Sequence, residues 1–230
     1  MSETVTWADA MPPMKGEGGS QEKIKAQLIR KVAVLNRGFV AMPEERADIE
    51  ELVELLEEEN PNPAPCHAFA DEESPVAGYW RLVYTTALDV LSLTLNPAVT
   101  VGQIYQRIAP DGRQIENIIE LQPPLAAVAN RLVGSSVARL TVKLDTEPVS
   151  DNRINLRFRR TELAPQTVFG KDVSGTLPPL GFDIPSLGQG KDAEKNAWFE
   201  TTYVDEDVRV GRSARGDLFV SLRAEEPAPQ

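Results

Sequence analysis

Two neighbouring residues are the only cysteine and the only histidine of this sequence, and they limit its chemistry. Cys66 and His67 follow each other directly. The side chains of neighbouring residues diverge in an extended chain, so these two are poorly arranged for a thiolate–imidazole pair. We interpret Cys66 as a thiol in a linker. A single cysteine and a single histidine also exclude an internal disulfide and most zinc sites.

Acidic residues are abundant, and one run of them has the composition of a cation site. Asp205, Glu206 and Asp207 could hold a divalent cation, but we prefer to interpret them as a turn between two strands. The sequence contains neither a glycine-rich phosphate loop nor a G-x-S-x-G nucleophile motif. It therefore predicts no catalytic residue, no metal and no cofactor, and a protein that is not an enzyme.

The composition is that of a globular protein with a marked negative charge. Of the 230 residues, 41% are hydrophobic and 26% are charged, and 35 acidic against 24 basic residues give a net charge of −11. This balance argues against a nucleic-acid partner and weakens electrostatic docking on an anionic membrane. No apolar run approaches the ~18 residues of a spanning helix. Without a secretion or transit pattern at its start, either the protein stays where it is made or a targeting segment is missing from this sequence.

The N-terminal part predicts a flexible arm, a helical hairpin and a linker. Residues 1–20 contain glycines and prolines and no periodicity. Residues 21–59 carry two apolar stripes at helical spacing, and Gly38 and Pro43 mark the connection between them. The stripes are Ile24, Leu28, Val32, Leu35 and Phe39, then Ile49, Leu52, Val53 and Leu56. The first helix is mainly basic and the second mainly acidic, which favours an antiparallel pair. Residues 60–77 are rich in proline and predict a linker.

Beyond Gly78 the apolar residues recur with period two, which is typical of antiparallel strands. Strands are expected near residues 80–85, 99–108, 114–121, 136–144, 153–159, 198–204, 207–212 and 218–223. Asp111-Gly112 between the second and the third is a hairpin signal. About eight short strands with tight turns predict a mainly β fold, an antiparallel up-and-down barrel over residues 78–224. The helical hairpin is expected outside this barrel, and residues 225–230 form a tail.

Two segments interrupt the strands. Residues 122–134 are expected to form a short helical turn at a barrel mouth. Residues 164–196 hold five glycines and four prolines, which disfavour a fixed element and strand pairing, so we expect a mobile portal. Its apolar residues, Leu177, Leu180, Phe182 and Ile184, are expected to meet a ligand or a lipid surface. The alternative is a disordered surface loop with incidental apolar residues.

The triplet Gly78-Tyr79-Trp80 resembles the opening G-x-W motif of lipocalins. In lipocalins the Trp closes the barrel floor, often under an Arg from a late strand. The resemblance implies that Trp80 is a buried floor residue, not a ligand contact, with Arg209 or Arg212 stacked on it. The chain also carries NRG at 36–38, NP at 60–61, GYWRLVYTT at 78–86, VGQIYQRI at 101–108, WFETTYVDEDVRVGR at 198–212 and GDLFV at 216–220. With these motifs, residues 21–224 resemble the plastid-lipid-associated protein family, also called plastid fibrillins.

This resemblance implies a lipocalin-like barrel associated peripherally with plastid thylakoids or plastoglobules, or with the equivalent cyanobacterial thylakoid. Members of the family are thought to bind or carry carotenoids, prenylquinones, fatty acids or galactolipids. The family offers no agreed catalytic residues. The side chains expected to line such a barrel are Leu82, Tyr84, Leu140, Val142, Ile154, Leu156 and Phe158. The alternative is that they fill a dry core, because a barrel of this size is often packed solid.

Three functions stay open at this stage. We favour the non-catalytic binding or carriage of a hydrophobic small molecule. The second is a structural coat or adaptor of plastid lipid droplets, which supports prenylquinone synthesis through an isoprenoid-synthesis enzyme as its partner. The third is an enzyme that acts on an isoprenoid in a dry pocket.

Overall fold

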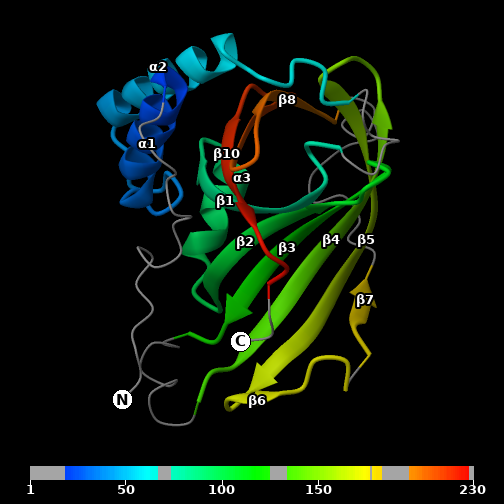
Figure 1. Ribbon diagram of the computed structural model, residues 1–230. Helices are drawn as coiled ribbons and strands as arrows, with labels where there is room; N and C mark the ends of the chain where they lie inside the picture. Colours follow the sequence, from blue (N-terminus) through cyan, green and yellow to red (C-terminus); the bar gives the residue numbers. More distant parts are fainter. Residues whose placement is uncertain (1–18, 67–73, 125–133, 177, 183–196, 228–230) are drawn as a thin grey trace.

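The strands expected from the period-two pattern close into an antiparallel barrel (Figure 1). The computed structural model describes residues 19–66, 74–124, 134–176, 178–182 and 197–227. The barrel strands are β1 (Gly78–Thr85), β2 (Thr100–Ile108), β3 (Gln114–Gln122), β4 (Val137–Pro148), β5 (Arg153–Val168), β8 (Trp198–Val204), β9 (Val208–Ser213) and β10 (Leu218–Ala224). Each pairs with the next, and β10 returns to β1. The predicted eight-stranded up-and-down barrel is confirmed.

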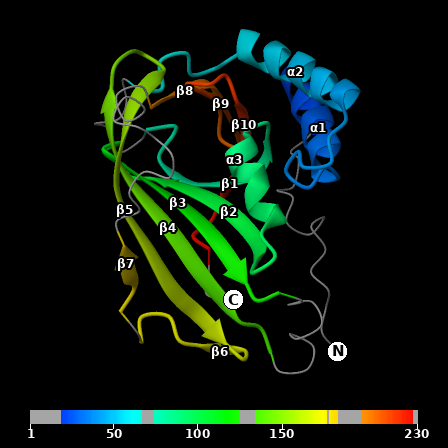
Figure 2. The same ribbon diagram turned by 180° about the vertical axis from the view of Figure 1, so that it is seen from behind.

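The seam between β5 and β8 is short. Only Arg153–Asn155, the first three of the 16 residues of β5, are in register with β8. Farther along, the same edge of β5 pairs with β7 (Leu180–Phe182) and β6 (Lys171–Asp172). The two long strands β4 and β5 therefore run on beyond the point where the barrel is closed (Figure 2).

Part of the segment expected to be a mobile portal is instead in strands. Residues 164–168 continue β5, and β6 and β7 follow within the same segment. Pro165 is accommodated because the register with β4 shifts beside it, between the pairs Ala138–Pro165 and Val137–Thr167. A proline lacks the N–H that a regular ladder requires, and an irregularity of this kind tolerates it. Leu177 and residues 183–196 lie outside the described residues, as do residues 125–133 of the expected helical turn.

The two N-terminal helices pack on the outside of the barrel, as predicted. They are α1 (Ser20–Ala33) and α2 (Pro43–Glu58), and they lie against the β1, β9 and β10 side (Figures 1 and 2). Both stripes are buried against the sheet apart from Phe39, which is 38% exposed. The shared core comprises Leu28, Val32, Leu35, Ile49, Leu52, Val53 and Leu56 from the hairpin and Tyr84, Tyr203, Val208, Val210, Leu218, Val220 and Leu222 from the strands.

The NRG triplet fastens this hairpin to the first strand. Asn36, Arg37 and Gly38 all have positive φ angles, of 45°, 60° and 97°. The loop they shape brings the Arg37 carbonyl within 3.0 Å of the backbone N–H of Thr85, which donates to it. A side chain at Gly38 would collide with the Thr85 carbonyl oxygen, so glycine is required there for space as well as for its conformation.

Charged groups hold the hairpin at two further places. Arg212 reaches Glu50 and Glu57 of α2, with nitrogen–oxygen distances of 2.5 and 3.4 Å. Arg212 therefore lies on the helix side of the barrel, and of the two arginines expected to stack on Trp80 it is Arg209 whose guanidinium lies near that ring, 5.5 Å from its centroid. Lys25 of α1 is 5% exposed, and its Nζ lies 2.9 Å from Asp205. This second contact ties α1 to the turn after β8.

The acidic run after β8 forms a turn. Asp205 accepts hydrogen bonds from the Tyr203 hydroxyl at 2.5 Å and from the backbone N–H groups of Asp207 and Val208 at 2.8 and 2.7 Å. Burial opposes the charge, but these bonds and Lys25 lower the pKa of the Asp205 carboxyl. The carboxylate oxygens of Asp205 are therefore occupied by hydrogen bonds and an ion pair within the fold.

The linker closes one end of the barrel. Asn60 and Asn62 donate side-chain hydrogen bonds to the carbonyls of Thr202 and Val204, at 2.9 and 2.8 Å. Farther on, the linker supplies two residues to the core at this end. That core consists of Cys66, Val76, Trp80, Ile108, Ile115, Ile154 and Val204. Burial, together with the charges of Asp151 and Glu200, raises the pKa of the Cys66 thiol to about 12. His67 lies outside the described residues.

Trp80 is the centre of this floor. Its side chain is fully buried, and its indole N–H donates to the Val76 carbonyl at 2.8 Å. The Arg223 guanidinium lies 3.9 Å from the ring centroid and that of Arg209 lies 5.5 Å away. The nearer cation therefore comes from β10, which pairs directly with β1 and sets Arg223 opposite Trp80. Arg223 also donates to the carbonyls of Pro75 and Glu206, at 2.7 and 3.1 Å.

Replacing Trp80 by Ala should lower the free energy of unfolding by about 3–5 kcal/mol, because the lost indole leaves a cavity in the floor. Urea unfolding measures this. Trp198→Ala, at a half-buried position, is the matched control and should cost about 1 kcal/mol. Equal losses in the two variants would contradict the role of Trp80.

Asp205→Asn should lower the free energy of unfolding at pH 7 by about 1.5–3 kcal/mol, because the buried Lys25 loses one of its two close carboxylates and keeps only Glu22, 2.5 Å away. The stabilisation from a carboxyl with a lowered pKa is present above the ordinary aspartate pKa and is lost as the pH falls through the lowered value. The difference between the two proteins should therefore shrink below about pH 4. Asp207→Asn is the control, since its carboxyl is half exposed and 3.7 Å from Lys25. Unfolding curves that stay equally far apart at pH 3 and pH 7 would refute this account.

Candidate functional site

A cavity of about 450 Å³ occupies the barrel above its floor. It begins at Trp80 and extends to α3 (Leu88–Ser92) and the 3₁₀-helix η3 (Leu93–Leu95), which follow β1. The apolar side chains that the barrel strands contribute to it include Leu82, Ile104, Ile119, Val142, Leu144, Leu156, Phe158, Phe199 and Phe219. The interior is thus filled with side chains at the floor and hollow above it.

Four of the seven residues expected to line the barrel lie on this cavity: Leu82, Val142, Leu156 and Phe158. Ile154 belongs to the packed floor. Leu140 is half-buried and lies two residues from Val142 along β4, outside the set that lines the cavity. A role of these residues in ligand binding stays a prediction.

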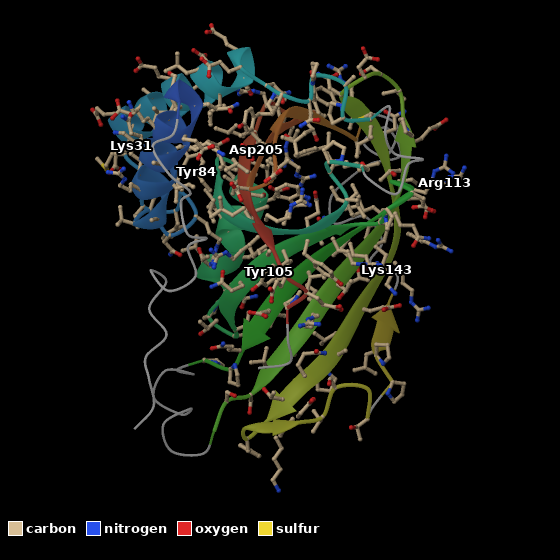
Figure 3. All side chains as sticks on the ribbon, in the orientation of Figure 1. Lys31, Tyr84, Tyr105, Arg113, Lys143 and Asp205 are labelled. Carbon is tan, nitrogen blue, oxygen red and sulfur yellow. The ribbon has the colours of Figure 1, made fainter. Side chains whose placement is uncertain are left out.

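Tyr84 lies on the other face of the wall. It is 1% exposed, within the core shared with the helices, and Figure 3 shows it on the helix side of the barrel. The register with β10 shifts between Leu82, which faces Ser221, and Tyr84, which faces Val220. Such an irregularity breaks the strict alternation of side chains, and a slip by one residue moves a side chain to the opposite face. The expected place of Tyr84 in the lining is therefore wrong.

The base of the cavity carries polar groups that sequence reasoning missed. Gln106 of β2 donates through its amide to the Asn117 side chain of β3 at 2.8 Å. Its amide oxygen accepts a short hydrogen bond from Arg209. Because β9 and β2 are separated in the sheet by β10 and β1, this bond crosses the interior. Residues two apart on a strand share a face, so Gln106 lies on the same face as Ile104 and Ile108, and Asn117 on the same face as Ile115 and Ile119. This spacing was a signal that the two polar residues face inward.

Arg209 is the most perturbed charge of the cavity. It is 5% exposed, and its guanidinium lies 5.5 Å from the ring centroids of both Trp80 and Phe199. Burial, and secondarily the charge of Arg223, lowers the pKa of Arg209 to about 9. Among the residues that the structure describes, no carboxylate forms an ion pair with it.

We define the entrance as the exposed part of the lining, which lies between α3 and the turn that joins β9 to β10. Asp89 and Arg215 line the cavity there, both exposed, with an ion pair of 2.6 Å between them. Leu88, 75% exposed, is next to Asp89. The short β5–β8 seam borders the same space, since Phe158 and Trp198 also line it.

Of the four residues expected to form a portal, Leu180 has a described side chain. Leu180 begins β7, is 69% exposed, and is not part of the cavity lining. Phe182 ends β7, opposite Thr161 of β5. Leu177 and Ile184 lie outside the described residues. Sequence reasoning did not foresee α3, although the apolar run around Leu88, Leu91 and Leu95 is a signal for an amphipathic turn.

The described part of the chain contains no group of three or more His, Cys, Asp or Glu side chains that could hold a metal ion. In the same part of the chain, no helix has the length and apolar character needed to cross a membrane.

Comparison with known proteins places this barrel among plastid proteins. The chain is 31% identical to plastid lipid-associated protein 1 of Brassica campestris, over 88% of this chain and 67% of the relative. It is 28% identical to plastoglobulin-1 of Pisum sativum, over 94% of this chain and 66% of the relative. A chromoplast-specific carotenoid-associated protein of an Oncidium hybrid is 25% identical, over 89% and 70%. These names support the plastid location expected from the sequence.

No solved structure matches the chain. The family model described as PAP_fibrillin matches residues 22–222, which include nearly all of α1, the whole of α2 and nearly the whole barrel. This match and the identity to the Brassica protein confirm the resemblance drawn from the motifs. The chain therefore belongs to the PAP_fibrillin family of plastid lipid-associated proteins.

Proposed function

We propose that this protein binds or carries one hydrophobic small molecule in its barrel, without catalysis, at thylakoid or plastoglobule surfaces. The observation that carries the proposal is the cavity of about 450 Å³ above the floor. Ligand pockets commonly measure roughly 300–1,000 Å³ and are lined mainly by apolar and aromatic side chains. A barrel of eight strands is about the smallest that holds one small ligand.

The division of the interior into two halves supports a binding role over a purely structural one. At the floor, Trp80 and Ile154 pack with the linker residues Cys66 and Val76. The hollow above the floor adds no packing to the fold, and an apolar hollow gains stability from an apolar occupant.

The names of the relatives indicate the class of ligand that the cavity would bind. One of them is named for its association with carotenoid, and others for plastid lipid or the plastoglobule. Carotenoids, prenylquinones, fatty acids and galactolipids are the candidate ligands for this chain. Each has an extended apolar part suited to the walls formed by Leu82, Ile119 and Phe158.

A variant that fills the cavity tests the proposal. Val142→Trp places an indole inside the hollow, whereas Thr141→Trp adds the same group on the outer face of the same strand. Each protein is purified from its own membranes and examined by native mass spectrometry with lipid extraction. The first variant should retain about tenfold less lipid than the parent, as a loss of about 1.4 kcal/mol in binding produces.

The second variant should retain as much lipid as the parent. A parent protein that leaves its membranes with an empty barrel would overturn the proposal. Equal lipid contents in the two variants would show that the lipid binds elsewhere.

A second function, as a structural coat of plastid lipid droplets, is favoured by one surface. We define the apolar loop as Val34, Phe39, Val40 and Met42, which join α1 to α2 and are 69%, 38%, 53% and 61% exposed. Grouped exposed apolar residues mark interaction sites. In this role the loop enters a neutral lipid surface, and it is also a contact offered to an isoprenoid-synthesis enzyme.

Replacing Val40 and Met42 together by Ser should reduce binding to neutral galactolipid vesicles by about tenfold, because two side chains no longer leave water. Vesicle flotation measures the bound fraction. Leu55→Ser, at a position on α2 that is 41% exposed, is the control and should leave binding unchanged. Binding that survives in the double variant, or that collapses on adding salt, would count against insertion of the apolar loop.

A further inference from the structure

Arg209 is a buried cation at the base of an apolar cavity, and the floor beneath it does not require its charge. Arg223 lies closer to Trp80 and ties the floor to the linker through backbone carbonyls. Arg209 instead extends across the interior to Gln106, at the level where the packed core ends and the hollow begins.

The charge of Arg209 is costly where it stands. A guanidinium removed from water loses its hydration, and in proteins such a charge is ordinarily paired with an anion. Its described partners are all neutral, the Gln106 amide and the rings of Trp80 and Phe199, and the charge that acts on it is another cation, Arg223. Burial, and secondarily the charge of Arg223, also lowers the pKa of Arg209. An anion placed in the cavity would offset this cost.

The surrounding polar groups fix the direction of the guanidinium. The Gln106 amide is oriented by Asn117, to which it donates, and so presents its oxygen to Arg209. Ser221 also lines this level. A guanidinium has five N–H donors in a planar fork that matches a carboxylate. Across the hollow, the next charged groups are Asp89 and Arg215 at the entrance, which pair with each other.

We propose that the cavity selects amphipathic carboxylates, such as a fatty acid or another long apolar acid, and that Arg209 binds the carboxylate. The inference rests on the proposed function and names the class of its ligand. The acid enters head first, with its carboxylate at Arg209 beside Gln106. Its chain lies along Leu82, Ile119 and Phe158 toward α3. Arg209 is then a specificity-determining residue, because neutral molecules with the same chain leave its charge unpaired.

The test compares an acid with its own ester. Dodecanoate and methyl dodecanoate have the same chain and differ in charge. Both are titrated at pH 7.5 into the full-length protein and into the variants Arg209→Gln and Arg212→Gln, with binding followed by calorimetry. Arg212 lies on the same strand as Arg209, on the helix side of the barrel, and serves as the matched control.

The parent protein and Arg212→Gln should bind the acid about 10- to 100-fold more tightly than the ester, as charge-assisted hydrogen bonds do. In Arg209→Gln the affinity for the acid should fall to that for the ester, while the affinity for the ester stays the same. Retained ester binding also shows that the variant is folded. Should this variant not fold, the parent protein decides: equal binding of acid and ester overturns the inference.

The outcomes separate the two proposals. If the parent binds acid and ester equally well, the cavity binds lipid but the carboxylate site is refuted. If the parent binds neither, the proposed function fails as well. A preference for the acid that persists in Arg209→Gln would show that another group binds the carboxylate.

Discussion

Closure of the sheet is the constraint on which the other features depend. An antiparallel sheet with free edges exposes unpaired backbone groups, and a closed barrel has none. The pairing of β10 with β1 sets Arg223 opposite Trp80 and so assembles the floor. The helices then cover the outer face of the same strands. On the other side, closure depends on the three residues of β5 that pair with β8. Beyond them the two strands no longer pair, and this part of the barrel wall borders the cavity.

Most of the fold could be predicted from the sequence because two periodicities are clear. Apolar residues at helical spacing predicted the hairpin, and alternation predicted the eight barrel strands, although β5 runs nine residues beyond its expected end at residue 159. The errors occur where alternation breaks. The irregularity after Leu82 moved Tyr84 to the outer face, and another accommodated Pro165 inside a strand. Both depend on the neighbouring strand, which a single segment of sequence does not contain.

The site could be predicted only in part, for a related reason. Alternation identifies which residues face inward, but not the height at which the interior changes from packed to hollow. Ile154 and Leu156 both face inward, yet the first belongs to the floor and the second to the cavity. The polar base needed the topology as well, since the contact of Arg209 with Gln106 joins strands that are distant in both sequence and sheet.

The buried thiol of the floor has a consequence for the redox behaviour of the molecule. The thiolate is the form that reacts with oxidants, and a thiol with a pKa of about 12 is almost wholly protonated near neutral pH. Cys66 is therefore shielded both by burial and by its protonation state. Oxidants that modify exposed cysteines should therefore react slowly with Cys66 in the native protein. Any modification of this single cysteine thus records that the closed end of the barrel had opened.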